Sequence, residues 1–124
     1  MSGHAALIGA LFSGLAVALG AFGAHALKSR LEPAMLEVWK TAVEYQFYHA
    51  LALILLGLFA RQMKTTVLDA SAICFIVGIL LFSGSLYALC LSGVRVLGAI
   101  TPIGGLLFLV GWTCFAYGLF RTGA

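Results

Sequence analysis

Charge is scarce in this sequence. Only 9% of its 124 residues are charged, and just four of them are acidic, whereas about a quarter of the residues in a soluble domain carry charge. Hydrophobic residues make up 63% of the chain. A small soluble domain buries only about two-thirds of the surface of its unfolded chain, so it could not hide this much apolar surface. These proportions exclude a soluble protein and indicate an integral membrane protein.

The basic residues and the cysteines are also few, and they exclude further functions. Seven Lys and Arg residues give a net charge of +3, as is typical of residues that flank membrane spans beside anionic lipid. No basic cluster contains interleaved aromatics, so nucleic acid is not an expected partner. Cys74, Cys90 and Cys114 lie singly in apolar runs, so we expect free thiols and no metal or other cofactor.

Four apolar segments are long enough to cross a membrane as helices, near residues 5–27, 42–60, 68–91 and 97–120. A helix needs about 20 residues to cross about 30 Å of hydrocarbon. Short connections make consecutive helices antiparallel. The sequence therefore predicts an all-α fold with a single transmembrane domain over residues 1–124, an antiparallel four-helix bundle.

The first span ends in Ala24-His25-Ala26, a pattern that resembles a signal-peptidase site. No Lys or Arg precedes the apolar run, and the run is longer than the roughly 7–15 residues of a signal peptide. We therefore expect the first span to be a retained helix.

The second helix is predicted to begin at Pro33, because proline suits the first helical position. At 1.5 Å per residue a helix over 33–60 is about 42 Å long, so its first turns should form an interfacial extension, with Trp39 at headgroup depth. Lys40 and Glu44 have the spacing of an i,i+4 ion pair. The extension is amphipathic, with Glu37, Lys40, Thr41 and Glu44 on one face and Met35, Trp39, Ala42 and Val43 on the other.

The starts of the last two helices are marked by polar residues. Thr66-x-x-Asp69 has the spacing of a capping box, which predicts Thr66 as the cap of the third helix. Two alternatives stay open for the fourth helix: Thr101 caps a helix that begins at Pro102, or the helix begins nearer Leu97 with Pro102 in its first turns.

Small residues recur at seven-residue spacing in three of the spans. Such stripes allow membrane helices to approach closely, so each stripe is predicted to face another helix. They are Gly104, Gly111 and Gly118 in the fourth span, Gly9, Ala16 and Gly23 in the first, and Gly78, Ser85 and Ser92 in the third.

Five motifs follow one another along the chain: LGAFGAH (19–25), EYQFYH (44–49), LFSGSLY (81–87), TPIGG (101–105) and GW (111–112). In this order and spacing they resemble a family of small membrane proteins of unknown function, widespread in bacteria, that includes vertebrate transmembrane protein 256. The resemblance covers nearly the whole chain. It implies a four-span protein of the bacterial cell membrane, and it implies no activity.

The polar members of these motifs are the candidate site residues. We expect Glu44 to be solvated at the interface, and the serines to pack helices together. His49 is deeper, with His25 as its expected partner. It is either a packing histidine or a residue that handles protons. The candidates are His25, Glu44, Tyr45, Gln46, His49, Ser85, Tyr87 and Thr101, with Ser83 beside them.

These residues contain no nucleophile–base pair and no metal ligand set, so an enzyme is not expected. Two functions stay open: a non-enzymatic bundle that binds membrane lipid or a partner membrane protein, and a homo-oligomeric proton-linked or small-solute conduit that uses His49, His25 and Glu44. The basic residues are nearly balanced between the two ends of the bundle. We expect the cell (inner) membrane with both termini cytoplasmic, because Arg61 and Lys64 lie in a short connection.

Overall fold

The computed structural model describes residues 2–63 and 65–123. Four long helices dominate it: α1 (Ala5–His25), α2 (Pro33–Ala60), α3 (Thr66–Ser92) and α4 (Thr101–Thr122). Two short 3-10 helices, η1 (Ser2–His4) and η2 (Arg95–Ala99), precede α1 and α4. All four long helices are long and apolar enough to cross a membrane. The predicted all-α, four-span architecture is therefore confirmed.

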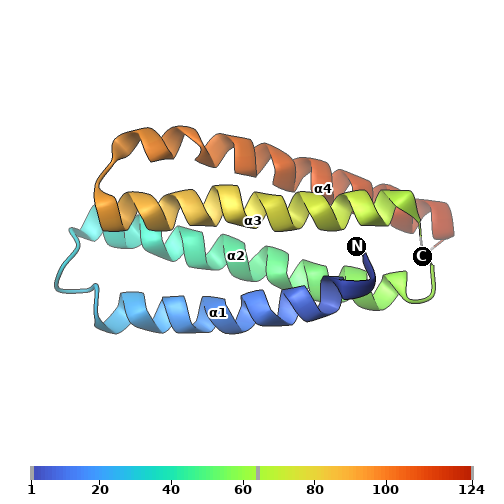
Figure 1. Ribbon diagram of the computed structural model, residues 1–124, viewed down its shortest axis with the longest axis horizontal. Coiled ribbons are helices and arrows are strands. Elements are labelled where there is room, and N and C mark those ends of the chain that lie inside the picture. Colours follow the sequence, from blue (N-terminus) through green and yellow to red (C-terminus); the bar gives the residue numbers. More distant parts are fainter. Residues whose placement is uncertain (1, 64, 124) are drawn as a thin grey trace.

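The helices run antiparallel to their neighbours along the chain (Figure 1). The main helix–helix contacts join α1 to α2, α2 to α3 and α3 to α4. Both termini lie at the end of the molecule where α2 connects to α3, and the α1–α2 and α3–α4 connections lie at the opposite end (Figure 1). Chain order is thus also spatial order, with α1 and α4 on the outside.

Glycines bring α4 against α3. A Cβ atom placed on Gly104 would overlap the backbone of Phe82, and one on Gly111 would lie 2.8 Å from the ring of Phe75. Gly118 lies in the same way against a leucine at the start of α3. The predicted glycine stripe of the fourth span therefore faces α3, as expected of small residues between membrane helices.

The contact between α1 and α2 depends on small residues from both helices. Gly9 and Gly23 of the predicted stripe are buried, as is the alanine between them. Gly57 approaches from α2, and a Cβ atom there would overlap the backbone of Ala6. In α3 the stripe is only partly confirmed, because Gly78 and Ser85 are buried whereas Ser92 is exposed.

The helix starts differ in part from those predicted. Helix α2 begins at Pro33 as expected, but the cap of α3 is Thr65, whose hydroxyl accepts a hydrogen bond from the Leu68 N–H at 3.2 Å. Thr66 is instead the first helical residue, so the predicted cap was wrong by one position. Helix α4 begins at Thr101, which is not its cap, and a separate 3-10 turn occupies 95–99.

The first turns of α2 are amphipathic, but the predicted ion pair was wrong. Lys40 pairs with Glu37 at 3.5 Å and not with Glu44. The Glu44 carboxylate accepts a hydrogen bond from the Tyr48 hydroxyl. Trp39 is only 2% exposed. Gly23 gives its ring room to lie against α1, since a Cβ atom at Gly23 would lie 2.5 Å from the indole.

Candidate functional site

Gln46 connects three helices through its amide group. Its Nε2 donates to the Phe12 carbonyl of α1 at 2.9 Å, and its Oε1 accepts from the Tyr87 hydroxyl of α3 at 2.7 Å. Gln46 is 2% exposed, so an apolar environment surrounds these bonds. Polar side chains between membrane helices commonly stabilise helix association in this way. Two of the candidate residues, Gln46 and Tyr87, are thus brought together.

The serines also bond across helix interfaces. Ser83 Oγ donates to the Ala42 carbonyl of α2 at 2.7 Å. Ser85 Oγ lies 2.6 Å from Thr101 Oγ1, which joins the end of α3 to the first residue of α4. This bond explains why the Thr101 hydroxyl does not cap its own helix. The serines therefore pack helices, as their sequence setting predicts.

His49 uses both of its ring nitrogens. Nδ1 lies 2.7 Å from the Tyr45 carbonyl oxygen, and Nε2 lies 3.0 Å from Trp112 Nε1 on α4. An indole nitrogen can only donate, and a carbonyl oxygen can only accept. The contacts therefore assign the proton to Nδ1 and the lone pair to Nε2. The imidazole also stacks on Phe108, with ring centroids 3.5 Å apart and planes inclined by 9°.

His25 does not meet His49. It is exposed at the end of α1, and both ring nitrogens of His49 are engaged by the Tyr45 carbonyl and by Trp112. The expected pairing was wrong because α3 and α4 supply the side chains beside His49, which are Phe75 from α3 and Phe108 and Trp112 from α4. Trp112 was not among the predicted candidates. The sequence signal that could have identified it is its position directly after Gly111, which belongs to the glycine stripe of the fourth span.

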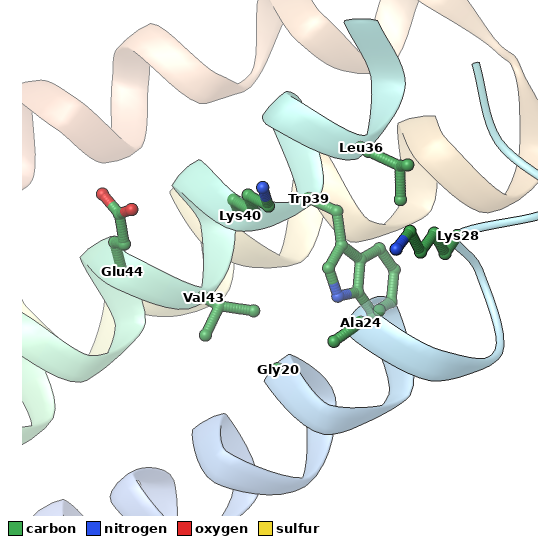
Figure 2. Close-up of a pocket in the computed structure, with 9 residues that line it drawn as sticks. Gly20, Ala24, Lys28, Leu36, Trp39, Lys40, Val43 and Glu44 are labelled. Atoms are coloured by element: carbon green, nitrogen blue, oxygen red, sulfur yellow. The ribbon is translucent and has the colours of Figure 1, made fainter. Parts of the chain in front are cut away.

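A groove of about 350 Å³ lies between α1 and α2, near the α1–α2 connection (Figure 2). Trp39 and Val43 point from α2 towards α1 in this view, and Lys28 reaches in from the segment after α1. Glu44 lies at the end of the groove away from Lys28. The lining residues are Gly20, Gly23, Ala24, Leu36, Trp39 and Val43, together with Lys28, Lys40 and Glu44.

The groove has an apolar wall and three charged side chains, those of Lys28, Lys40 and Glu44. Lys28 forms no ion pair with any residue that the structure describes, whereas Lys40 is paired with Glu37. Of the candidate site residues only Glu44 lines this groove. Sequence analysis missed Lys28 and Trp39, because only the folded chain places the connection after α1 beside the first turns of α2.

A family model described as a protein of unknown function, DUF423, matches residues 19–105. The chain belongs to the DUF423 family. It is 45% identical to a UPF0382 membrane protein of Staphylococcus haemolyticus over 93% of both chains. A UPF0382 membrane protein of Haemophilus influenzae is 49% identical, over 86% of this chain and 85% of that protein. No solved structure matches the chain. The predicted membrane family is confirmed, and this DUF423 protein is an integral membrane protein.

Proposed function

We propose that this DUF423 protein is a non-enzymatic membrane protein that binds an anionic phospholipid in the groove between α1 and α2. The observation that carries the proposal is the presence of Lys28 and Lys40 beside an apolar wall in the same groove. Basic residues next to a membrane span attract anionic headgroups. A phosphate paired with an ammonium group forms a charge-assisted hydrogen bond, which is stronger than a neutral one.

The depth of the groove suits a lipid headgroup. It lies near one end of the helices, where α1 connects to α2 (Figures 1 and 2), and helix ends lie where hydrocarbon gives way to headgroups. Gly20, Gly23 and Ala24 give α1 a smooth surface beside Trp39. One acyl chain would lie along this surface while the phosphate meets the lysines.

The bonding of the polar side chains supports a non-enzymatic role. Three buried serines are engaged in helix packing: Ser71 and Ser83 donate to main-chain carbonyls, and Ser85 pairs with Thr101. Across residues 2–63 and 65–123, no three His, Cys, Asp or Glu side chains gather as metal ligands would. The alternative function, an oligomeric conduit through His49, His25 and Glu44, has less support, because both nitrogens of His49 are engaged.

We also propose the cell (inner) membrane, with both termini cytoplasmic. Arg61 and Arg121 lie at the end that carries the termini, and Lys28, Arg30 and Arg95 lie at the other end. Lys64, on which the expectation also rests, lies outside the described residues. A reporter fused to the C-terminus should be active only as a cytoplasmic reporter. Activity of a periplasmic reporter at that position would reverse the orientation.

Lipid retention by the purified protein tests the binding proposal. Native mass spectrometry should show phosphatidylglycerol retained in preference to phosphatidylcholine. Lys28→Gln combined with Lys40→Gln should remove the preference. The matched control, Arg30→Gln combined with Arg95→Gln, removes the same charge from exposed positions at the same end of the molecule and should keep it.

Equal loss of the preference in both double variants would show general charge attraction and contradict lipid binding in the groove.

The same spectra report the mass of the complex, so they also test whether the protein binds a second copy of itself or another membrane protein. The helices present exposed leucines on their outer faces, and in the membrane these meet lipid, a second copy or another membrane protein. They include Leu7 and Leu11 on α1 and Leu106 and Leu109 on α4.

A further inference from the structure

Glu44 lies at the depth of the hydrocarbon, below the interfacial position expected from the sequence. Its neighbour Val43 lies against Gly20 of α1, because a Cβ atom on Gly20 would be 3.4 Å from a methyl group of Val43. Gly20 is five residues before the end of α1 at His25, which is about 8 Å along the helix. With 21 residues, α1 is about 32 Å long and only just crosses about 30 Å of hydrocarbon. The Glu44 side chain therefore starts inside the apolar layer.

The charge of Glu44 is not neutralised within the described chain. Glu44 forms no ion pair with any residue that the structure describes, and Lys40, one turn away, is paired with Glu37. Its carboxylate accepts a hydrogen bond from the neutral Tyr48 hydroxyl at 3.4 Å, and it points away from α1 and from Lys28 (Figure 2). An ionisable side chain is costly inside a membrane and by default marks a functional site. A cation from outside the described chain would stabilise it.

A pocket of about 410 Å³ opens beside Glu44, between α2 and α4. Tyr48 connects the two, because its ring lines the pocket and its hydroxyl donates to the carboxylate. The pocket volume lies within the roughly 300–1,000 Å³ that is typical of small-molecule sites. Its lining is mainly aromatic, with Tyr45, Phe108 and Trp112 beside Tyr48. An apolar group held in this pocket would carry any attached charge close to Glu44.

Charge selects the kind of molecule that suits this place. The rings of Tyr45, Tyr48 and Trp112 are exposed at the pocket, and those of Tyr45 and Tyr48 lie 5.7 Å apart at 57°. The face of such a ring attracts a cation electrostatically. An acyl chain or a neutral ring gains nothing from the negative charge of Glu44, and a small inorganic cation would not fill an apolar pocket. An organic cation gains from the carboxylate, the rings and the pocket together.

We propose that Glu44 and the pocket between α2 and α4 bind a lipophilic organic cation. Its apolar groups enter the pocket, and its positive charge lies beside the Glu44 carboxylate and the rings of Tyr45 and Tyr48. The lipid groove lies between α1 and α2 and takes an anionic headgroup on its lysines. The two sites therefore require ligands of opposite charge, and either can fail without the other.

Tetraphenylphosphonium and tetraphenylborate test the site, because the two ions have nearly the same size and shape and opposite charge. Equilibrium dialysis is carried out with the protein in phosphatidylcholine nanodiscs, whose zwitterionic lipid carries no net charge, and with empty nanodiscs as the reference. Tetraphenylphosphonium should bind with saturation above the reference, and tetraphenylborate should not. Equal binding of the two ions, or no saturable binding of the cation, would overturn the proposal.

Two variants locate the bound cation. Glu44→Gln should weaken tetraphenylphosphonium binding at least about tenfold, because it removes the opposite charge from an apolar environment. The matched control is Glu32→Gln, which removes the same charge from an exposed position before the start of α2 and should leave binding unchanged. Gly105→Leu should fill the pocket, since a Cβ atom there meets only the Phe82 ring, at 3.8 Å, and should weaken binding similarly. Full affinity in Glu44→Gln or in Gly105→Leu would contradict the site.

Lys28→Gln combined with Lys40→Gln separates this proposal from the proposed lipid site. The double variant removes positive charge near Glu44, so it should bind tetraphenylphosphonium as tightly as the wild type or more tightly. The same variant should lose its preference for phosphatidylglycerol if the groove binds anionic lipid. Loss of tetraphenylphosphonium binding in this variant would contradict a cation site at Glu44, whatever the lipid measurement shows.

Discussion

The indole nitrogen of Trp112 on α4 lies 3.0 Å from Nε2 of His49 on α2. This bond holds His49 as the tautomer whose Nδ1–H donates to the Tyr45 carbonyl, because two donors cannot face each other across it. A proton added to Nε2 would break the bond to Trp112. The geometry therefore favours His49 as a residue that fixes the packing of α2 against α4.

Replacing the indole should destabilise the protein through His49. Trp112→Phe leaves Nε2 without a donor in an apolar environment, and we expect the free energy of unfolding to fall by about 1–3 kcal/mol. Unfolding in mixed detergent micelles measures it. In a His49→Phe background no acceptor is left unpaired, so the same substitution should cost less. An equal cost in both backgrounds would mean that the bond contributes nothing.

Gln46 and Tyr87 should be energetically coupled. Gln46→Met and Tyr87→Phe each remove one partner of the 2.7 Å bond. A double-mutant cycle on unfolding free energies should give a coupling of about 0.6–1.7 kcal/mol, the range from the average to the largest values known between membrane helices. A coupling indistinguishable from zero would leave Gln46 as a packing residue with an incidental contact.

Two glycines of the α3–α4 pair should respond oppositely to alanine. Gly104→Ala places a methyl group into the backbone of Phe82, whereas Gly84→Ala meets nothing within 4 Å. We expect the first to destabilise by about 1–3 kcal/mol and the second to stabilise by up to about 1 kcal/mol. Thermal melts of both variants measure these changes in stability. If Gly104→Ala melts like the wild type, α4 does not approach α3 at that face.

The start of α3 gives a further matched pair. Thr65 accepts the cap bond from Leu68, so Thr65→Ala should cost about 1 kcal/mol. Thr66 lies inside the first turn, and Thr66→Ala should be nearly neutral. A larger effect at Thr66 than at Thr65 would restore the capping box that the sequence alone suggests.

Features set by local periodicity could be predicted from the sequence. The four spans follow from the length of the apolar runs, the start of α2 at Pro33 follows from the chemistry of proline, and the faces of Gly104 and Gly111 follow from their spacing. Each of these depends only on residues within one helix. The cap of α3 was misplaced because Thr65 and Thr66 are adjacent and have the same side chain.

Features that depend on contacts between helices could not be predicted in this way. The partner of His49 was sought on α1, since a short connection joins α1 to α2, but α4 supplies Trp112 across the face of α3. The burial of Trp39 could not be predicted, because Gly23 on another helix provides the space for its ring. Lys28 belongs to a connection whose path the sequence does not specify.

Quenching of Trp39 by brominated lipid tests most directly whether the groove holds an anionic lipid. Trp112→Phe leaves Trp39, which lines the groove, as the only tryptophan. Dibrominated phosphatidylglycerol should quench Trp39 more strongly than dibrominated phosphatidylcholine, and Lys28→Gln with Lys40→Gln should abolish the difference while Arg30→Gln with Arg95→Gln preserves it. Equal quenching by the two lipids with both lysines in place would contradict the proposed function.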